Sequence, residues 1–153
     1  MDLSDLLSRQ NVEIRSAATK GKALSALADL AARQLLIEPQ PVLDALVRRE
    51  RAGSTGVGGG VALPHARLEG LERTHGVFMR LDLPVAFDAV DDQPVDLFFA
   101  LFAPVDAGAD HLRALARVSR LLRSGELRQQ LRVARSPDAL FALLAQEARP
   151  SAA

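Results

Sequence analysis

The residues from Val95 to Phe102 form an almost continuously apolar run, interrupted only by Asp96. A strand of this kind has no polar face, so other parts of the chain must cover both of its faces. Segments with helical periodicity lie before and after the strand-forming part of the sequence and do not alternate with single strands. The run therefore predicts an α/β fold with one mixed β-sheet flanked by helices on both faces.

The positions of the other elements follow from apolar spacing and from capping residues. Leucine and alanine recur at helical spacing from Thr19 to about Glu38, and Ser136 before Pro137 is typical of a helix N-terminus. A short helix or turn is expected at residues 3–7 and an edge strand at 11–14. Further helices are expected at residues 19–38, 41–52, 109–123, 126–134 and 137–146, and further strands at 61–63, 76–83 and 95–102.

Length and composition limit the class of protein. The chain has 153 residues, 48% of them hydrophobic, which is enough for one domain over residues 1–153. The absence of cysteine excludes disulfides and thiol chemistry and fits a cytoplasmic location. The N-terminus lacks the features of a secretory signal, and the longest apolar run, residues 97–105, is too short to be embedded in a membrane. Nineteen basic and nineteen acidic residues cancel, so no overall field favours nucleic acid.

A glycine-rich segment contains five glycines between residues 53 and 60. Glycines permit positive φ, so several backbone N–H groups can turn toward one anion. We predict a phosphate-binding loop made of Gly53, Ser54, Thr55, Gly56, Gly58, Gly59 and Gly60. Pro64 cannot donate a backbone hydrogen bond and holds Leu63 extended, so the strand at 61–63 is expected to stop just before His65. The imidazole would then lie at a strand end beside the loop.

The glycine spacing does not match the common nucleotide-binding motifs. No Gly-Lys-Ser or Gly-Lys-Thr follows, as a P-loop requires, and valine and leucine stand at 61 and 63, where a dinucleotide fingerprint needs its third glycine. A serine hydrolase elbow would need glycine in place of Ala52. His75 belongs to no motif and is expected in a loop. Three histidines without cysteine or His-x-x-x-His spacing give little indication of a metal, so we expect no metal and no cofactor.

Several separated segments resemble one bacterial protein family. Residues 49–58, Arg-Glu-Arg-Ala-Gly-Ser-Thr-Gly-Val-Gly, and Val-Ala-Leu-Pro-His at 61–65 resemble the active-site signature of the type-2 (fructose/mannitol) enzyme IIA proteins of the phosphotransferase system. The resemblance continues at residues 76–78, 84–97 and 111–115 and is greatest to the nitrogen-regulatory branch. Two positions differ from it: the family often has asparagine at Gly59 and glycine at Ala66.

The resemblance implies a phosphocarrier with a mixed sheet between helical layers. His65 would accept a phosphoryl group from a phosphohistidine carrier protein, His111 would form a hydrogen bond near it, and Arg49 would lie at the site. A neutral imidazole nitrogen is an available nucleophile near neutral pH, and a guanidinium offers planar donors to phosphoryl oxygens. The nitrogen-regulatory branch further implies a regulator of nitrogen, carbon or potassium physiology that acts on target proteins.

Other interpretations remain open. The protein could be a sugar-specific component that passes the phosphoryl group to a permease IIB domain, or a non-catalytic module whose phosphorylation only switches partner binding. Without the resemblance, a histidine such as His65 is more often a turn residue without a role, and His111 could be a solvent-facing histidine at a helix end. Three arginines share one face of the expected helix 109–123, which is either a solvated face or a docking surface for an acidic partner: Arg113, Arg117 and Arg120.

Overall fold

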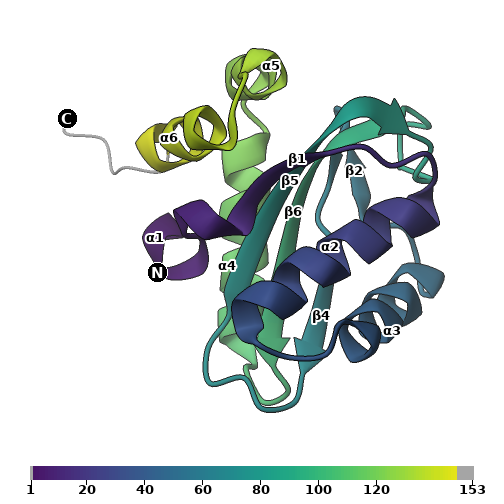
Figure 1. The fold of residues 1–153 in the computed structure, drawn as a ribbon, viewed down its shortest axis with the longest axis vertical. Coiled ribbons are helices and arrows are strands. Elements are labelled where there is room, and N and C mark those ends of the chain that lie inside the picture. Colours follow the sequence, from purple (N-terminus) through teal and green to yellow (C-terminus); the bar gives the residue numbers. More distant parts are fainter. Residues whose placement is uncertain (1, 148–153) are drawn as a thin grey trace.

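The computed structural model describes residues 2–147 and contains a six-stranded mixed sheet between two layers of helices (Figure 1). The strands are β1 (Val12–Arg15), β2 (Gly56–Gly58), β3 (Val61–Ala62), β4 (His65–Leu68), β5 (His75–Val85) and β6 (Val95–Pro104). The helices are α1 (Leu3–Leu6), the 3-10 helix η1 (Arg9–Asn11), α2 (Lys20–Leu35), α3 (Pro39–Arg51), α4 (Ala109–Leu122), α5 (Gly125–Val133) and α6 (Pro137–Glu147). The expected α/β architecture is confirmed.

Strand β6 lies in the middle of the sheet and is covered on both faces. Phe98, Ala100 and Phe102 belong to the core beneath α2 and α3. The intervening residues Leu97, Phe99 and Leu101 belong to the core beneath α1, α4, α5 and α6. Burying one such leucine or phenylalanine stabilises the fold by about 1.5–3 kcal/mol, so the apolar run anchors both helix layers.

The sheet combines parallel and antiparallel pairs. Its order is β1-β5-β6-β3-β2, and β4 also pairs with β6. β5 is antiparallel to β6, whereas β1 is parallel to β5, and β3 and β4 are both parallel to β6. β1 forms one edge, as expected for residues 11–14. The opposite edge is formed by β2 along one part of the sheet and by β4 along the other.

The strand predicted at residues 61–63 ends before His65, as expected, but a second strand segment begins at His65 itself. Val61 pairs with Leu97 and His65 pairs with Leu101, so β3 and β4 follow β6 in one constant register. Pro64 interrupts the ladder because it has no N–H, but its carbonyl oxygen still accepts from the Leu101 amide at 2.9 Å. His65 is therefore the first residue of a second strand segment, β4, which sequence reasoning missed.

Some other boundaries also differ from expectation. α2 ends at Leu35, three residues early, because Leu36 adopts a left-handed conformation with φ 57°. Glu38 is extended and Pro39 opens α3, so this helix begins two residues before the expected Pro41. His75 begins β5 and does not lie in a loop. Within residues 2–147, no helix is long and apolar enough to cross a membrane.

Candidate active site

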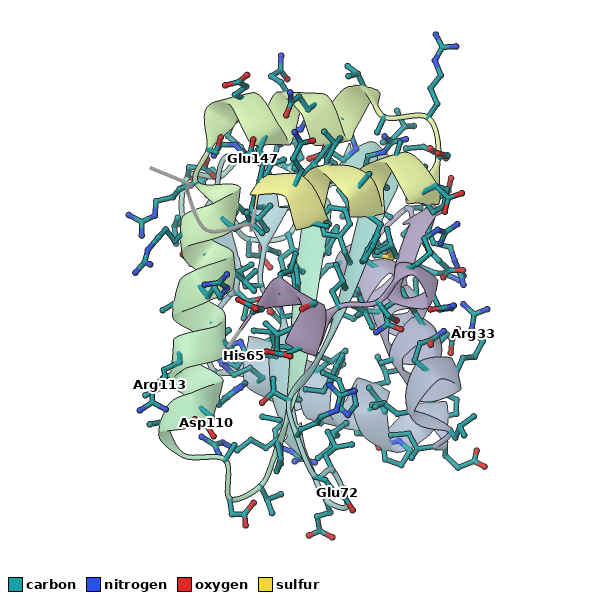
Figure 2. All side chains as sticks on the ribbon, turned by 90° about the vertical axis from the view of Figure 1, so that its left-hand side faces the viewer. Arg33, His65, Glu72, Asp110, Arg113 and Glu147 are labelled. Atoms are coloured by element: carbon teal, nitrogen blue, oxygen red, sulfur yellow. The ribbon has the colours of Figure 1, made fainter. Side chains whose placement is uncertain are left out.

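His65 lies at the edge of the sheet where β4 pairs with β6. α3 belongs to the helix layer on one face of the sheet and α4 to the layer on the other, so side chains from both layers can reach this edge (Figure 1). Figure 2 shows His65 beside α4, with Asp110 and Arg113 nearer the N-terminal end of that helix. The imidazole is half-buried. The site therefore forms between the two helix layers.

Two hydrogen bonds define which nitrogen of His65 carries the proton. Arg49 Nε donates to His65 Nε2 across 3.1 Å, and a guanidinium can only donate, so Nε2 is unprotonated. His65 Nδ1 lies 3.0 Å from the Leu63 carbonyl oxygen, which can only accept, so Nδ1 carries the hydrogen. The nucleophilic lone pair of the ring is therefore on Nε2.

The protonation state of His65 follows from its surroundings. Burial lowers the pKa of the imidazole, the hydrogen bond to the Leu63 carbonyl opposes this effect, and the charge of Arg49 lowers the pKa further. The net shift is downward from the ordinary value, so the ring is neutral near pH 7. A neutral ring is the form in which Nε2 can attack an electrophile.

Arg49 is held by the loop that follows its helix. It lies in the last turn of α3, and its Nη1 donates to the Gly53 carbonyl oxygen across 2.9 Å. This contact orients the guanidinium so that Nε faces His65. Among residues 2–147, no acidic side chain forms an ion pair with Arg49. Its positive charge is thus available to an anion bound at His65.

His111 is part of the inward stripe of α4 and is not at a solvent-facing helix end. It is 5% exposed and shares this stripe with Ala114, Val118 and Leu122. Its ring centroid lies 5.4 Å from that of His65, with the ring planes at 60°. Burial, with smaller contributions from His65 and Arg67, lowers the pKa of His111 to about 4. The ring is therefore neutral at pH 7.

The Nδ1 atom of His111 is buried and has no hydrogen-bond partner within the described residues. Leaving a buried polar atom unpaired costs about 1–3 kcal/mol, and such atoms are rare in folded proteins. The sequence did contain a signal that His111 faces inward: residues 111, 114, 118 and 122 are spaced three or four apart, which places them on one face of the helix. The imidazole of His111 is thus held against His65 by packing.

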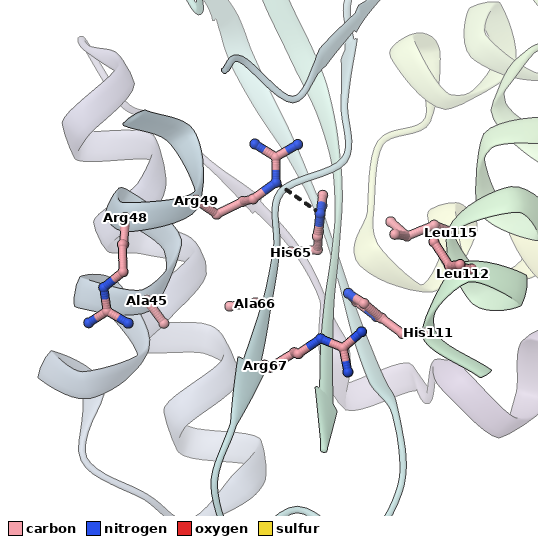
Figure 3. Close-up of a pocket in the computed structure, with 9 residues that line it drawn as sticks. All are labelled: Ala45, Arg48, Arg49, His65, Ala66, Arg67, His111, Leu112 and Leu115. Atoms are coloured by element: carbon pink, nitrogen blue, oxygen red, sulfur yellow. Dashed lines mark hydrogen bonds between the residues drawn. The ribbon is translucent and has the colours of Figure 1, made fainter. Parts of the chain in front are cut away.

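The described lining of the site encloses a pocket of about 450 Å³ (Figure 3). Its cationic and imidazole groups come from α3, β4 and α4, and it has no acidic member. The lining residues are Ala45, Arg48, Arg49, His65, Ala66, Arg67, His111, Leu112 and Leu115. Sequence reasoning missed Arg67, although it stands two residues after His65. No strand was expected beyond residue 63, so nothing indicated that the two side chains share one face of a strand. The arrangement suits an anionic ligand.

The first half of the predicted phosphate-binding loop has acceptors for its N–H groups in the chain itself. The amide of Gly53 donates to the Glu50 carbonyl oxygen, and the amide of Thr55 donates to the Glu50 carboxylate. The amide of Gly56 donates to Ser54 Oγ across 3.0 Å. These hydrogen bonds fold the loop back on the end of α3. The loop contacts the site through the Gly53 carbonyl oxygen described above.

The second half of the loop binds an anion that belongs to the chain, the carboxylate of Asp91. Gly58, Gly59 and Gly60 all have positive φ, and the Gly59 amide donates to Asp91 Oδ2 across 3.0 Å. This hydrogen bond and one from the Gln93 amide lower the pKa of Asp91 below its ordinary value. The described lining of the His65 pocket contains none of the loop residues. The loop is thus an anion-binding turn whose anion is already present.

Arg132 closes this turn from the other side. Its guanidinium donates to the Gly59 carbonyl oxygen at 2.7 Å and to the Asp96 carboxylate at 3.0 Å. A methyl group added at Gly60 would lie 2.2 Å from Arg132 Nη2.

Two positions differ from the family pattern, Gly59 and Ala66. A left-handed conformation, such as that of Gly59 with φ 67°, also accepts asparagine, and Ala66 lies buried in β4. The two departures from the family pattern therefore fit the structure.

Glu50 is a second residue that sequence reasoning did not single out. Glu50 is 9% exposed, and its carboxylate forms an ion pair with Lys20 at 2.9 Å and accepts from the Thr55 hydroxyl. Lys20 in turn lies 4.5 Å from the centre of the Phe87 ring. This buried pair ties α2, α3 and the loop together. Neither residue belongs to the described lining of the pocket.

The arginines of α4 do not converge on His65. Arg113 pairs with Asp110 at 2.7 Å on the exposed side of the helix, and Arg117 lies 3.9 Å from Asp2. Arg120 is exposed. None of the three lines the described part of the pocket. Throughout residues 2–147, no group of three or more histidine or acidic side chains is placed so that it could hold a metal ion.

Comparison with known proteins shows which family the chain belongs to. The family model described as the phosphoenolpyruvate-dependent sugar phosphotransferase system, EIIA 2, matches residues 5–147. The protein is therefore a member of this type-2 enzyme IIA family, a group of phosphotransfer components. The resemblance read from residues 49–65 and the later segments is confirmed.

Individual relatives come from both branches of the family. A nitrogen regulatory protein of Bradyrhizobium diazoefficiens is 47% identical over 127 residues, covering 83% of each chain. A fructose-specific EIIA component of Haloferax volcanii is 34% identical over 151 residues, covering 95% of this chain and 98% of its own.

Solved structures share the fold. The nitrogen regulatory protein IIA of Neisseria meningitidis superimposes with a TM-score of 0.86 at 31% identity, over 93% of this chain and 98% of the other. Mannitol enzyme IIA of Escherichia coli, solved in complex with phosphorylated mannitol enzyme IIB, gives a TM-score of 0.75 at 25% identity, over 92% and 97%.

Proposed function

We propose that this protein is a phosphocarrier in which Nε2 of His65 accepts a phosphoryl group from the phosphohistidine of a carrier protein. The observation that carries the proposal is the pair of hydrogen bonds that leaves the lone pair on Nε2 and the proton on Nδ1. A neutral, oriented imidazole in a basic pocket is the arrangement that such a transfer requires. Membership of the enzyme IIA family supports it.

The transfer is an in-line displacement at phosphorus. The Nε2 lone pair forms the new P–N bond while the P–N bond of the donor breaks, and the donor imidazole leaves with that electron pair. His65 keeps its Nδ1 proton, so the product ring is positively charged and is stabilised by its hydrogen bond to the Leu63 carbonyl. Apart from a proton that His111 takes up from solvent, no group other than the two imidazoles changes its covalent bonds. Catalysis is then positioning and electrostatic stabilisation.

Arg49 and His111 act on the phosphoryl group without bonding to it covalently. Arg49 Nε, which donates to free Nε2, would transfer its hydrogen bond to a phosphoryl oxygen once Nε2 is occupied. His111 lies edge-on to His65 and, with a phosphate beside it, would take up a proton and donate to that phosphate. Four amides of the glycine loop have no role in this proposal, because the chain supplies their acceptors: those of Gly53, Thr55, Gly56 and Gly59.

We infer further that the protein serves as a regulator in the cytoplasm, where the added negative charge changes which target proteins it binds. The nitrogen regulatory relative at 47% identity and the structure at TM-score 0.86 favour this role. The fructose-specific relative and the mannitol complex support a second candidate, transfer to a IIB domain during sugar uptake. In a third, non-catalytic version, phosphorylation serves only as a switch.

Labelling tests the acceptor. After incubation with a phosphorylated phosphohistidine carrier protein, the wild type should gain one phosphoryl group that is lost in acid and survives base, as a phosphoramidate does. His65→Ala should not be labelled, whereas His75→Ala, which removes a histidine outside the pocket, should be labelled like the wild type. Labelling of His65→Ala would refute the assignment.

Growth and partner binding separate the two roles. For a regulator, deletion of the gene leaves growth on single phosphotransferase sugars near normal, and the proteins captured by wild type and by His65→Ala differ. Loss of growth on fructose or mannitol alone, with identical captured proteins, would establish the sugar-uptake role instead.

A further inference from the structure

Arg67 shares a strand face with His65. The two residues stand two apart in β4, and side chains alternate between the faces of a strand, so both point to the same side. The intervening Ala66 and the following Leu68 are 6% and 7% exposed and pack into the core beneath α2 and α3. Arg67 is exposed and lines the His65 pocket. The strand therefore presents a nucleophile and a guanidinium together.

Most of the donors of Arg67 have no acceptor within residues 2–147. Its Nη1 donates to the Val105 carbonyl oxygen across 3.3 Å, and a guanidinium has five N–H groups. Across the described chain, no carboxylate forms an ion pair with Arg67. Arg132 differs in this respect, because its fork is filled by Asp96. Arg67 thus keeps both its charge and several donors for a ligand.

Arg67 acts on both histidines of the pocket. Its charge contributes to lowering the pKa of His65 and of His111, which places it within electrostatic reach of both rings. In Figure 3, Arg49 lies on one side of His65, whereas the guanidinium of Arg67 lies beside His111. An anion on Nε2 would therefore have a cation on each side.

Resting on the proposed phosphorylation of His65, we propose that Arg67 is a second catalytic cation that donates to the phosphoryl oxygens from the side of His111. A phosphoryl group carries a charge of about −1.5 to −2, and a guanidinium on the side of His111 adds a permanent positive charge that does not depend on proton uptake by that ring. Arg67 supplies a second charge and forms no covalent bond. It remains protonated throughout, because a guanidinium does not lose its proton in proteins.

Phosphoramidate is a suitable probe, because this small P–N donor tests the pocket without the docking of a protein. The wild type, Arg67→Gln, Arg67→Lys and Arg135→Gln are incubated with it, and labelling of His65 is followed by mass spectrometry. Arg135 is exposed and outside the described pocket lining, so its variant removes one charge from the chain but none from the site. Arg67→Gln should be labelled about 10-fold more slowly than the wild type, below the roughly 10²–10³-fold loss for a fully preorganised donor because Arg67 is exposed.

A second measurement detects the contact in the product. Titration of phosphorylated His65 by ³¹P NMR should show a higher pKa of the phosphoryl group in Arg67→Gln, because a cation beside the dianion is gone. Arg67→Lys, which keeps the charge but not the fork, should fall between the wild type and Arg67→Gln in both readouts. Arg135→Gln should match the wild type.

The outcomes separate this inference from the proposed function. Equal labelling rates and equal phosphoryl pKa values for the wild type and Arg67→Gln would overturn the role of Arg67 and leave His65 as the acceptor. A wild type that is not labelled at His65 by either phosphoramidate or a phosphorylated carrier protein would overturn the proposed function itself.

Discussion

The glycine loop at residues 53–60 and the pocket around His65 are both built to hold an anion, but they differ in whether the anion is already present. In the loop, the Gly59 amide donates to the Asp91 carboxylate. In the pocket, Arg49 and Arg67 have no acidic partner among residues 2–147. Anion-binding geometry by itself therefore does not locate a ligand site. We propose that the ligand site is the pocket, where the charges of Arg49 and Arg67 have no acidic partner among the described residues.

Because of this difference, substitutions in the two regions should affect different properties: stability for the loop and phosphoryl transfer for the pocket. Four loop amides, those of Gly53, Thr55, Gly56 and Gly59, have acceptors in the folded chain, so a change there acts on the free energy of unfolding. Among residues 2–147, the side-chain hydrogen bonds of Arg49 go to an imidazole and a carbonyl oxygen and it has no ion pair, so its removal should change stability less than it changes phosphoryl transfer. A change in the pocket should therefore act on phosphoryl transfer.

The largest effect is expected for the pocket arginine. Arg49→Ala should slow labelling of His65 by around 10²-fold, because it removes a charged donor aimed at the phosphoryl oxygens. Single-turnover transfer from the phosphorylated carrier measures this rate. Arg51→Ala, which removes an exposed arginine of the same helix outside the described pocket lining, is the matched control and should retain the wild-type rate. An unchanged rate in Arg49→Ala would remove Arg49 from the site.

A loop substitution should instead lower stability. Gly60→Ala places a methyl group 2.2 Å from Arg132 Nη2 at a backbone φ of 78°, so it should reduce the free energy of unfolding by about 2 kcal/mol. Urea unfolding measures this change. Under conditions where the variant is folded, its transfer rate should equal that of the wild type. A large loss of rate without loss of stability would show that the loop belongs to the site.

The protonation of His111 should respond to the pocket being filled. In the free protein its pKa is about 4, and a phosphoryl dianion on the neighbouring His65 should raise this pKa. NMR titration of the imidazole in both states measures the shift. If the pKa of His111 were unchanged by phosphorylation, the ring would not face the phosphoryl group.

The lowered pKa of His111 in the unphosphorylated protein also determines how the free energy of unfolding changes with pH. The unfolded chain binds a proton near pH 6.5, whereas the folded chain binds it near pH 4, so the contribution of neutral His111 is complete above pH 6.5. It should decline as the pH falls toward about 4. The difference in unfolding free energy between the wild type and His111→Gln should shrink over that range.

The smallest effect is expected for the anion of the loop. Asp91→Asn removes the charge that the Gly59 amide binds, but it leaves the pocket intact, so the rate of transfer should stay within about twofold of the wild type. The same single-turnover assay measures it. A loss comparable to that of Arg49→Ala would contradict the separation of the two regions.

Local pattern was sufficient to predict the architecture and the principal candidates of the site. The apolar run from Val95 to Phe102 indicated a strand with two covered faces. Side chains alternate between the two faces of a strand, so a continuous apolar run places apolar residues on both faces, and both must be buried. Helix spacing and capping residues predicted most elements around it. The segments around Arg49, His65 and His111 indicated the family, and the structure brings these three side chains together.

Tertiary structure alone decided how the glycine loop and Arg67 are used. The sequence of residues 53–60 shows that N–H groups can converge on an anion, but Asp91 reaches them from 32 positions away. Arg67 became part of the pocket because β6 continues to pair with the chain beyond Pro64, which extends the strand past His65. Both outcomes depend on contacts between distant segments. Local spacing determines which conformations a segment can adopt, whereas partners brought close by folding determine which donors and charges remain free.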